Sequence, residues 1–181
     1  LNKIKEQAVR MNKLISEISE AAIVDNDLVT QSRERFDLSN TVAEIVNHYV
    51  ETNEYSELNL SSDIQKNIVF LGLPERIGQV VVNLLDNAFS FCKPKGTIKI
   101  LLHKRWRRKP ILIVEDSGPG VSEGSRELIF ERFYTSRSGA AVVNNSSGLG
   151  LFICKQIIEA HGGRIIVTNS SLGGARFELV F

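Results

Sequence analysis

The sequence lacks both of the commonest phosphate-binding fingerprints. Neither GxxxxGK[ST] nor GxGxxG occurs in its 181 residues. The two cysteines, Cys92 and Cys154, lie far apart and form no CxxC pair, so neither a zinc site nor a disulfide framework is indicated, and a reducing intracellular setting is expected. No run reaches the ~18 apolar residues of a membrane helix, and no signal peptide is recognisable. A P-loop enzyme, a disulfide-stapled secreted domain and a membrane-spanning segment are therefore not expected.

The composition is balanced in charge and moderately hydrophobic. The 22 Lys and Arg residues nearly match the 21 Asp and Glu residues, and the net charge of +1 gives no general attraction to nucleic acid or to membranes. A hydrophobic fraction of 43% and a charged fraction of 24% are typical of a soluble globular protein. The length fits one ordinary domain plus an appendage. Because the only methionine is Met11, we expect a piece of a longer protein.

Residues 1–24 carry apolar side chains at alternating intervals of three and four. This spacing, kept for about three heptads, predicts a long helix that contributes to a coiled-coil or bundle seam. A surface helix lying on the following domain is the alternative. Residues 25–35 are polar and are predicted to form a linker. The seam positions are Leu1, Ile4, Ala8, Met11, Ile15, Ile18 and Ala22.

The remaining residues alternate between helical and strand patterns. Neighbouring strands can pair antiparallel while helices intervene elsewhere, so we expect an α+β fold. It is a two-layer α/β sandwich with a mixed, largely antiparallel sheet covered by helices on one face. Ser39 or Asn40 can cap the first of these helices. Helices are predicted at 39–54, 75–91, about 122–129 and 148–161, and strands at 57–64, 67–71, 97–103, 111–116, 164–169 and 175–181.

Three short motifs predict a nucleotide site: NLLDNA at 83–88, DSGPG at 116–120 and SGLGL at 147–151. The first places two amides on one face of a helix. The second is a carboxylate followed by glycines that let the backbone approach a ligand closely. The third is a glycine pair opening a helix, where unpaired N–H groups attract phosphate. Each also fits a plain structural explanation alone, but their order and combination favour a nucleotide pocket.

In this order the motifs resemble those of the catalytic ATP-binding domain of sensor histidine kinases, part of a wider ATPase group shared with gyrase, mismatch-repair and heat-shock chaperone proteins. The segment 83–91 is similar to the asparagine box of that family, and 116–120 to its first glycine box. The phenylalanine box is matched by FERFY at 130–134, the second glycine box by 148–151 and a last glycine-containing strand by 173–177. The resemblance divides the chain into the catalytic ATP-binding domain, at 36–181, and the second helix of a dimerisation domain with its linker, at 1–35.

The base of ATP is expected at the second motif. The carboxylate of Asp116 can accept a hydrogen bond from the exocyclic amine of adenine, where guanine has a carbonyl. Gly118 and Gly120 allow the backbone to pass beneath the base, and Val121 offers an apolar wall.

The phosphates are expected at the start of the last helix. Gly148, Leu149, Gly150 and Leu151 bring its unpaired N–H groups to the ligand, and Ser147 can add a hydroxyl.

Two further contributions are expected near the phosphates. Residues 135–146 are predicted to form a mobile flap from which Arg137 can reach them, and Asn83 lies close to them on its helix. The resemblance implies that Asn87 holds Mg²⁺, an ion that needs only one or two protein oxygens when it shares the phosphates.

The sequence departs from the family at two places. Many members carry a lysine where this chain has Ser90, a role that Lys93 can partly take over. The phosphoacceptor histidine motif is missing, so no catalytic residue is expected within this chain. The three histidines are interpreted as structural, with His161 near a helix C-terminus where positive charge is favourable; the others are His48 and His103.

The resemblance implies transfer of the γ-phosphoryl group of Mg-ATP to a histidine, for relay to the receiver domain of a response regulator. A homodimer is expected in the full-length protein, with this part in the cytoplasm and any membrane contact through missing segments. The alternatives are a related ATPase or serine kinase, and a non-catalytic nucleotide-binding scaffold. The basic run HKRWRRK at 103–109 could contact nucleic acid, but its place between two strands favours an exposed turn.

Overall fold

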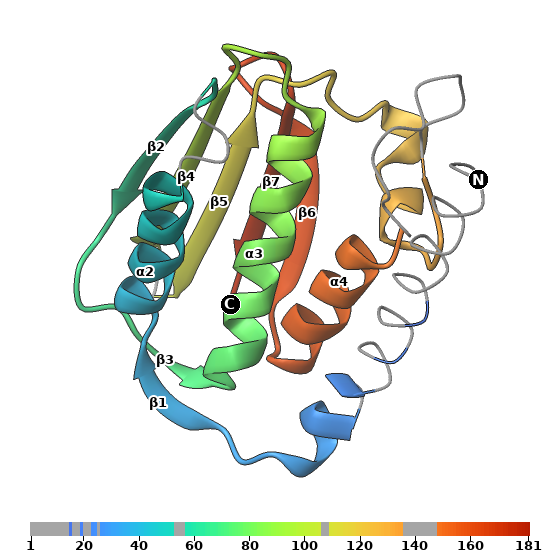
Figure 1. Cartoon of the computed structure of the whole chain (residues 1–181). Coiled ribbons are helices and arrows are strands. Elements are labelled where there is room, and N and C mark those ends of the chain that lie inside the picture. The colour runs from blue at the N-terminus through green and yellow to red at the C-terminus, as the bar shows by residue number, and fades with distance from the viewer. Residues whose placement is uncertain are drawn as a thin grey trace, which may run out of the picture.

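The protein has two layers, a five-stranded sheet and a layer of helices on one of its faces (Figure 1). The computed structural model describes residues 15, 19, 23–24, 26–52, 57–105, 109–135 and 148–181. The strands are β1 (Glu34–Asp37), β2 (Asn59–Ile64), β3 (Val69–Gly72), β4 (Thr97–Lys104), β5 (Pro110–Asp116), β6 (Arg164–Asn169) and β7 (Ala175–Val180). The helices are α2 (Leu38–Glu51), α3 (Pro74–Phe91) and α4 (Gly150–Ala160), with single 3₁₀ turns at Glu123–Ser125 and Leu128–Phe130. The expected α+β class and mixed sheet are confirmed.

The main sheet has the strand order β2-β4-β5-β7-β6. Strand β2 runs parallel to β4, and the other neighbours are antiparallel. The predicted antiparallel pairing of consecutive strands is correct for β4 with β5 and for β6 with β7. It is wrong for β2 with β3, because β3 instead pairs with β1, a strand that the sequence pattern had assigned to the linker and the start of the next domain. These two strands form a separate ribbon beside the sheet.

Helix α3 lies at the centre of the helical layer. Its apolar residues repeat with the helical period and so form one face of the helix. Seven of its residues are buried, and Pro74 stands in its first turn, where the missing N–H costs nothing. The buried face packs on β5 and between α2 and α4 (Figure 1). The buried residues are Ile77, Val80, Val81, Leu84, Leu85, Ala88 and Phe89.

The cap of α2 differs from the prediction. The side chain of Asp37 accepts hydrogen bonds from the N–H groups of Ser39 and Asn40, so Asp37 is the N-cap residue. Ser39 is buried and has another task, because its hydroxyl donates to the carbonyl of Gln65 and accepts from the N–H of Ile68. The hydroxyl therefore holds the β2–β3 connection against α2.

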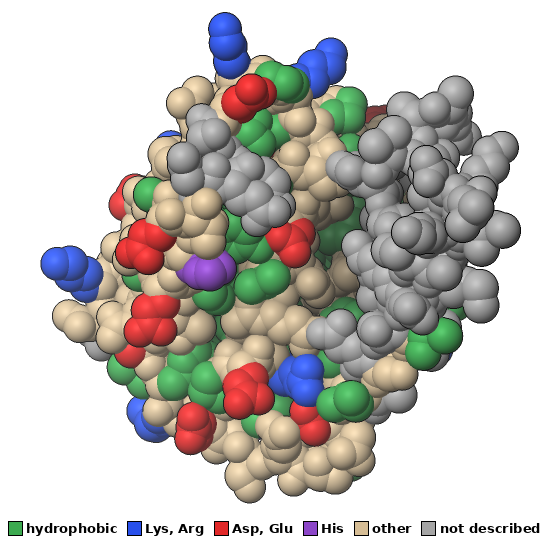
Figure 2. All heavy atoms as spheres, in the orientation of Figure 1, with side chains coloured by type: hydrophobic (Ala, Val, Ile, Leu, Met, Phe, Trp, Pro, Cys, Tyr) green, Lys and Arg blue, Asp and Glu red, His purple; other side chains and the backbone are tan. Residues whose placement is uncertain are grey.

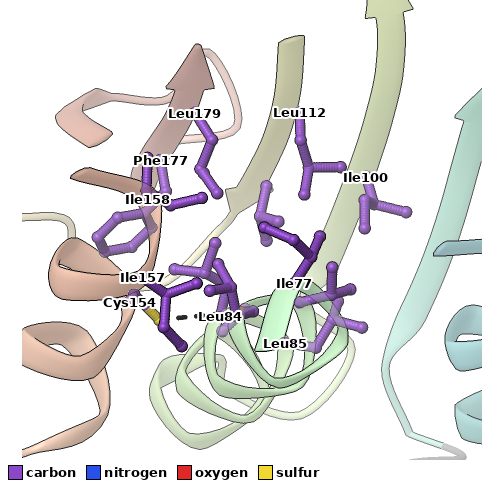
Figure 3. Packing of buried hydrophobic residues seen from close by; sticks show 14 of the residues in the cluster. Ile77, Leu84, Leu85, Ile100, Leu112, Cys154, Ile157, Ile158, Phe177 and Leu179 are labelled. Carbon is purple, nitrogen blue, oxygen red and sulfur yellow. Dashed lines mark hydrogen bonds between the residues drawn. The ribbon is translucent and has the colours of Figure 1, made fainter. Parts of the chain in front are cut away.

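The core lies between α3, α4 and the inner face of the sheet (Figure 3). Ile100 of β4, Leu112 of β5 and Leu179 of β7 are fully buried and face Leu84 and Ile157 from the two helices. Each such side chain contributes on the order of 1.5–3 kcal/mol through burial. This contact fixes the two helices that carry the first and third motifs against one sheet.

The C-terminal end of α4 is joined to the β1–β3 ribbon through His161. Its Nε2 accepts a hydrogen bond from the N–H of Leu73 at 3.0 Å, and its Nδ1 lies 2.7 Å from the carbonyl of Ile157. Arg33, just before β1, donates to the carbonyl of Ala160. Burial, assisted by the positive charge of Arg33, lowers the pKa of His161, although the bond to Ile157 opposes this. His161 therefore joins two elements as a structural residue, and its lowered pKa disfavours the positive charge that a helix end would favour.

The predicted seam of residues 1–24 falls almost wholly outside the described residues. Of its seven positions only Ile15 is described, and its side chain is exposed. Residues 26–30, assigned to the linker by the sequence pattern, are helical.

No helix within the described part of the chain has the length and apolar character needed to cross a bilayer. On the helical side of the molecule, acidic side chains are spread over the α2 part of the surface (Figure 2).

Candidate active site

Helix α3 positions the two asparagines of the first motif on its polar side. The side-chain amide of Asn83 donates to the carbonyl of Gly150 at 3.3 Å, which joins the middle of α3 to the first residue of α4. Asn87, one turn further along, is half-buried, and no hydrogen bond links its side-chain amide to a described residue. The first and third motifs, 67 residues apart in the chain, therefore meet at one point.

Asp116 ends β5 and is almost completely buried. Its Oδ1 accepts hydrogen bonds from the N–H of Gly118 at 2.8 Å and of Ala175 at 3.2 Å. Burial raises the pKa of Asp116, and the two N–H bonds partly offset the increase. With Oδ1 occupied, Oδ2 is left for a ligand, because no described residue bonds to it. A carboxylate with one fixed and one available oxygen suits recognition of a single N–H donor.

The glycines after Asp116 are needed where they stand. A Cβ on Gly118 would lie 2.9 Å from Oδ1 of Asp116 and 3.0 Å from the carbonyl oxygen of Phe91. Gly120 has a φ of +73°, a conformation that side-chain-bearing residues rarely adopt. Val121 is partly buried against the core. These glycines therefore let the loop pack tightly against Asp116 and Phe91, with the apolar Val121 at its end.

The start of α4 is the place where phosphate binding was expected. Leu149 is the N-cap residue and has no side-chain capping bond, and the first N–H groups of a helix lack an intrahelical acceptor. A Cβ on Gly150 would only touch Asn83, at 3.8 Å, so this glycine leaves free space. Leu151 is partly buried against the core. The partial positive charge of a helix N-terminus favours phosphate at this position.

Gly148, just before α4, is held by the phenylalanine-box segment. Its carbonyl accepts the N–H of Phe133 at 3.1 Å, and its φ is +75°. A Cβ at this position would lie 2.6 Å from the carbonyl oxygen of Tyr134. Phe130 is buried and stands edge-on to Phe177 of β7. The phenylalanine box thus anchors the approach to α4 on the core.

Several predicted contributors lie beyond the described residues. Arg137 and Ser147 belong to the segment 136–147, which also contains all of the predicted flap except Thr135. Lys93, suggested as a replacement for the family lysine, is described and exposed, and Ser90 is half-buried. The structure gives no contact between the Lys93 ammonium and the site.

Sequence reasoning missed two residues that shape the site, Gly174 and Ala175. The N–H of Gly174 donates to the carbonyl of Asp116 at 3.1 Å, and that of Ala175 donates to its carboxylate. A Cβ on Gly174 would overlap Oδ1 of Asp116. The pair Gly173 and Gly174, just before the last strand, was visible in the sequence, but the sequence analysis assigned it no role in the site.

The histidines and cysteines do not form a second centre. His103 on β4 lies 3.2 Å from Asp63, His48 is exposed on α2, and His161 is the junction described above. Burial raises the pKa of the Cys154 thiol to about 12, so it stays protonated. Within the described ranges, no group of three or more His, Cys, Asp or Glu side chains is placed to hold a metal.

These features define an ATPase domain without a P-loop. On one mixed sheet, helix α3 carries two asparagines, a buried carboxylate lies beside glycines, and glycines stand at the start of α4. The chain belongs to the family of histidine kinase-, DNA gyrase B- and HSP90-like ATPases, whose profile matches residues 72–181. Its relatives identify it further as the ATPase catalytic domain of sensor histidine kinases.

Two curated relatives are sensor proteins. The chain is 34% identical over 188 residues to the sensor protein ChvG of Rhizobium meliloti, and 36% identical over 183 residues to that of Agrobacterium fabrum. These alignments cover 97% and 94% of this chain but only 33% and 30% of the relatives. The chain thus spans about a third of their length.

Solved structures of the same kind share the fold. The mycobacterial sensor histidine kinase MprB superposes with a TM-score of 0.70 at 27% identity, covering 82% of this chain and 96% of that one. The catalytic domain of the histidine kinase ThkA gives a TM-score of 0.72, also at 27% identity, with 83% and 95% covered.

Proposed function

We propose that this chain binds Mg-ATP and supplies its γ-phosphoryl group to a histidine of a sensor kinase, for relay to the receiver domain of a response regulator. Residues 36–181 would be the ATP-binding unit, and 1–35 the second helix of a dimerisation domain with its linker. The observation that carries the proposal is the hydrogen bond from Asn83 to Gly150, since it joins the amide-bearing helix to the phosphate-binding helix start.

Asp116 is the residue that would select adenine. Its Oδ2 accepts the exocyclic amine, while Gly118 and Ala175 hold Oδ1 in place. Gly118 and Gly120 let the loop beneath the proposed base pack closely on its neighbours, and Val121 would contribute apolar contact. Guanine would turn a carbonyl oxygen toward the carboxylate, leaving two acceptors facing each other at a cost of about 1–3 kcal/mol. ATP is expected to bind roughly 5- to 150-fold more tightly than GTP.

The phosphates would lie at the start of α4, in contact with the N–H groups of Gly148, Gly150 and Leu151 and beside Leu149. Arg137 and Ser147 remain proposed contributors from sequence alone.

Asn87 would give Mg²⁺ one amide oxygen. This donor set fits the ion, because Mg²⁺ accepts hard oxygen ligands and normally takes the rest of its shell from phosphate and water. Asn87 is half-buried on the same helix as Asn83, and its amide is not engaged with any described residue. When bound, the ion would neutralise charge that develops on the phosphate oxygens.

The arrangement favours transfer over hydrolysis. Related ATPases that hydrolyse ATP carry a glutamate at the position of Asn83, and an amide cannot take a proton from water. The carboxylate next to Asn87, Asp86, is exposed and accepts the hydroxyl of Tyr49 from α2 at 2.5 Å. Asp86 is therefore directed toward α2 and does not replace the missing base.

The phosphoacceptor would lie in a part of the kinase outside this chain. His161 is buried with both ring nitrogens engaged, and His103 is paired with Asp63. A homodimer is proposed for the whole kinase, with this domain on the cytoplasmic side of a membrane-anchored sensor.

The test uses ATP labelled on its γ-phosphate. The chain alone is expected to bind ATP without acquiring acid-labile label, and a longer version carrying the upstream helix is expected to acquire it. Acid-labile label on the chain alone, mapped to His48, His103 or His161, would contradict the assignment of an external acceptor.

A further inference from the structure

A second carboxylate lies directly beside the one proposed to read adenine. Glu115 and Asp116 are consecutive residues of β5, so their side chains leave opposite faces of the sheet. Asp116 faces the helical layer, and Glu115 faces the side without helices. Glu115 is nevertheless only 6% exposed. A buried carboxylate is costly unless it is paired and hydrogen-bonded, so its partners must matter to this end of the sheet.

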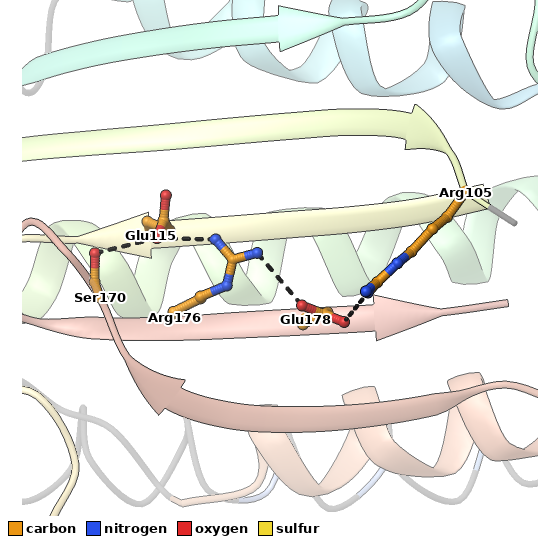
Figure 4. A network of polar contacts seen from close by, with 5 residues as sticks. All are labelled: Arg105, Glu115, Ser170, Arg176 and Glu178. Atoms are coloured by element: carbon orange, nitrogen blue, oxygen red, sulfur yellow. Dashed lines mark hydrogen bonds and ion pairs between the residues drawn. The ribbon is translucent and has the colours of Figure 1, made fainter.

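Those partners come from β7 and from the turn before it (Figure 4). Arg176, directly across the ladder from Glu115, approaches its carboxylate to 3.0 Å. The hydroxyl of Ser170, itself buried, donates to the same carboxylate oxygen at 3.4 Å. Arg176 also contacts Glu178 at 3.3 Å, and Glu178 contacts Arg105 at 3.4 Å. Because Arg105 is 69% exposed, this outer pair is screened by water and is expected to contribute little.

Ser170 begins the turn that carries the amides bound to Asp116. Its hydroxyl accepts the N–H of Leu172 at 3.0 Å, and its own N–H donates to the carbonyl of Gly174 at 2.8 Å. At the end of the turn the N–H of Gly174 donates to the carbonyl of Asp116, and that of Ala175 donates to its carboxylate. One turn is therefore held by Glu115 on one face of the sheet and holds Asp116 on the other.

We propose that Glu115, Arg176 and Ser170 are positioning residues for the adenine-reading carboxylate. They fix the 170–174 turn so that the Ala175 N–H captures Oδ1 of Asp116 and leaves Oδ2 directed at the base. The inference rests on the proposed function, in which Asp116 reads adenine. A merely structural role would weaken binding of every nucleotide alike, whereas a positioning role weakens discrimination between bases.

The experiment compares the affinities of ATP and GTP for the whole chain by calorimetry. Arg176→Met removes the cation facing Glu115, and Ser170→Ala removes the hydroxyl with a smaller change in packing. Arg176→Lys keeps the charge. Arg105→Gln is the matched control, because it breaks only the exposed outer pair of the same network. Thermal unfolding of each variant shows that it is folded at the temperature of the assay.

The ratio of ATP to GTP affinity is expected to fall about 2- to 12-fold in Arg176→Met and Ser170→Ala, as for the loss of one hydrogen bond. The ratio should remain near the unmutated value in Arg176→Lys and Arg105→Gln. An unchanged ratio in the first two variants, an equal loss for both nucleotides, or an equal effect of Arg105→Gln overturns the positioning role. If the unmutated chain already binds ATP and GTP equally, it is the adenine-reading role of Asp116 that fails.

Discussion

Replacing His161 tests how the helical layer is joined to the β1–β3 ribbon. The N–H of Leu73 donates to Nε2 of His161 at 3.0 Å, and both residues are buried. His161→Asn keeps a polar group near Nδ1 but leaves the Leu73 N–H without an acceptor. A buried unsatisfied N–H costs about 1–3 kcal/mol. Since each kcal/mol lowers the Tm of a domain of this size by about 2–4 °C, we expect a Tm about 2–12 °C lower.

The burial of His161 makes the free energy of unfolding depend on pH. The pKa of His161 is lowered in the folded protein, so the unfolded chain takes up a proton at a higher pH than the folded one. The contribution of His161 to stability is complete above the unfolded pKa of about 6.5 and is lost as pH falls toward the folded pKa. His161→Gln keeps an acceptor near Nε2 without titrating in this range. It should therefore lose less stability on acidification than the unmutated chain.

The assay is denaturant unfolding at about pH 8 and about pH 5.5, on either side of the ordinary histidine pKa. His48 and His103 are present in both proteins, so their contributions cancel in the comparison. The reasoning fails if the Gln variant loses as much free energy of unfolding on acidification as the unmutated chain. It also fails if His161→Asn unfolds at the unmutated temperature.

Three further substitutions probe the nucleotide site. Asp116→Asn removes a carboxylate whose pKa burial has raised, so the nucleotide-free protein should keep or gain Tm near neutral pH. In calorimetry the same variant should lose most of its preference for ATP over GTP, because an amide N–H can donate to guanine; a preserved preference would contradict the role of Asp116. Asn87→Ala should weaken ATP binding in Mg²⁺ far more than in a chelator, and an equal loss in both would assign the metal elsewhere. Gly148→Ala should cost about 1–3 kcal/mol of folding stability, because its Cβ would lie 2.6 Å from the Tyr134 carbonyl oxygen. Gly150→Ala is its matched control, and equal unfolding curves for the two variants would refute the steric argument.

Local periodicity was enough to predict most elements of the fold. The 75–91 helix was recognisable because its apolar residues follow the helical period and a proline opens it, and the observed helix is Pro74–Phe91. The four-residue strand β1 was missed, since its pairing with β3 joins segments about 35 residues apart and leaves no short-range pattern. The cap of α2 was placed on Ser39 or Asn40, because capping preference alone cannot distinguish these residues from Asp37.

For the site, the motifs predicted which residues matter but not how they are held. Nothing in the alternation of ARFELV distinguishes Arg176 from an ordinary solvent-facing residue. Its ion pair with the buried Glu115 depends on strand order and register. The N–H of Ala175 could not be foreseen either, because any residue supplies the same group and only its place opposite Asp116 gives it a role.

Helix α4 connects the nucleotide site mechanically to the segment before β1. Its 11 residues form a rigid rod about 16 Å long, at 1.5 Å per residue. At one end Gly150 is tied to Asn83, and at the other the carbonyl of Ala160 is tied to Arg33. Because a helix resists stretching, a displacement of the segment before β1 has two outcomes: it breaks the Arg33 contact, or it shifts the start of α4 against Asn83. As long as the Arg33 contact holds, a pull on residue 33 therefore shifts residue 150.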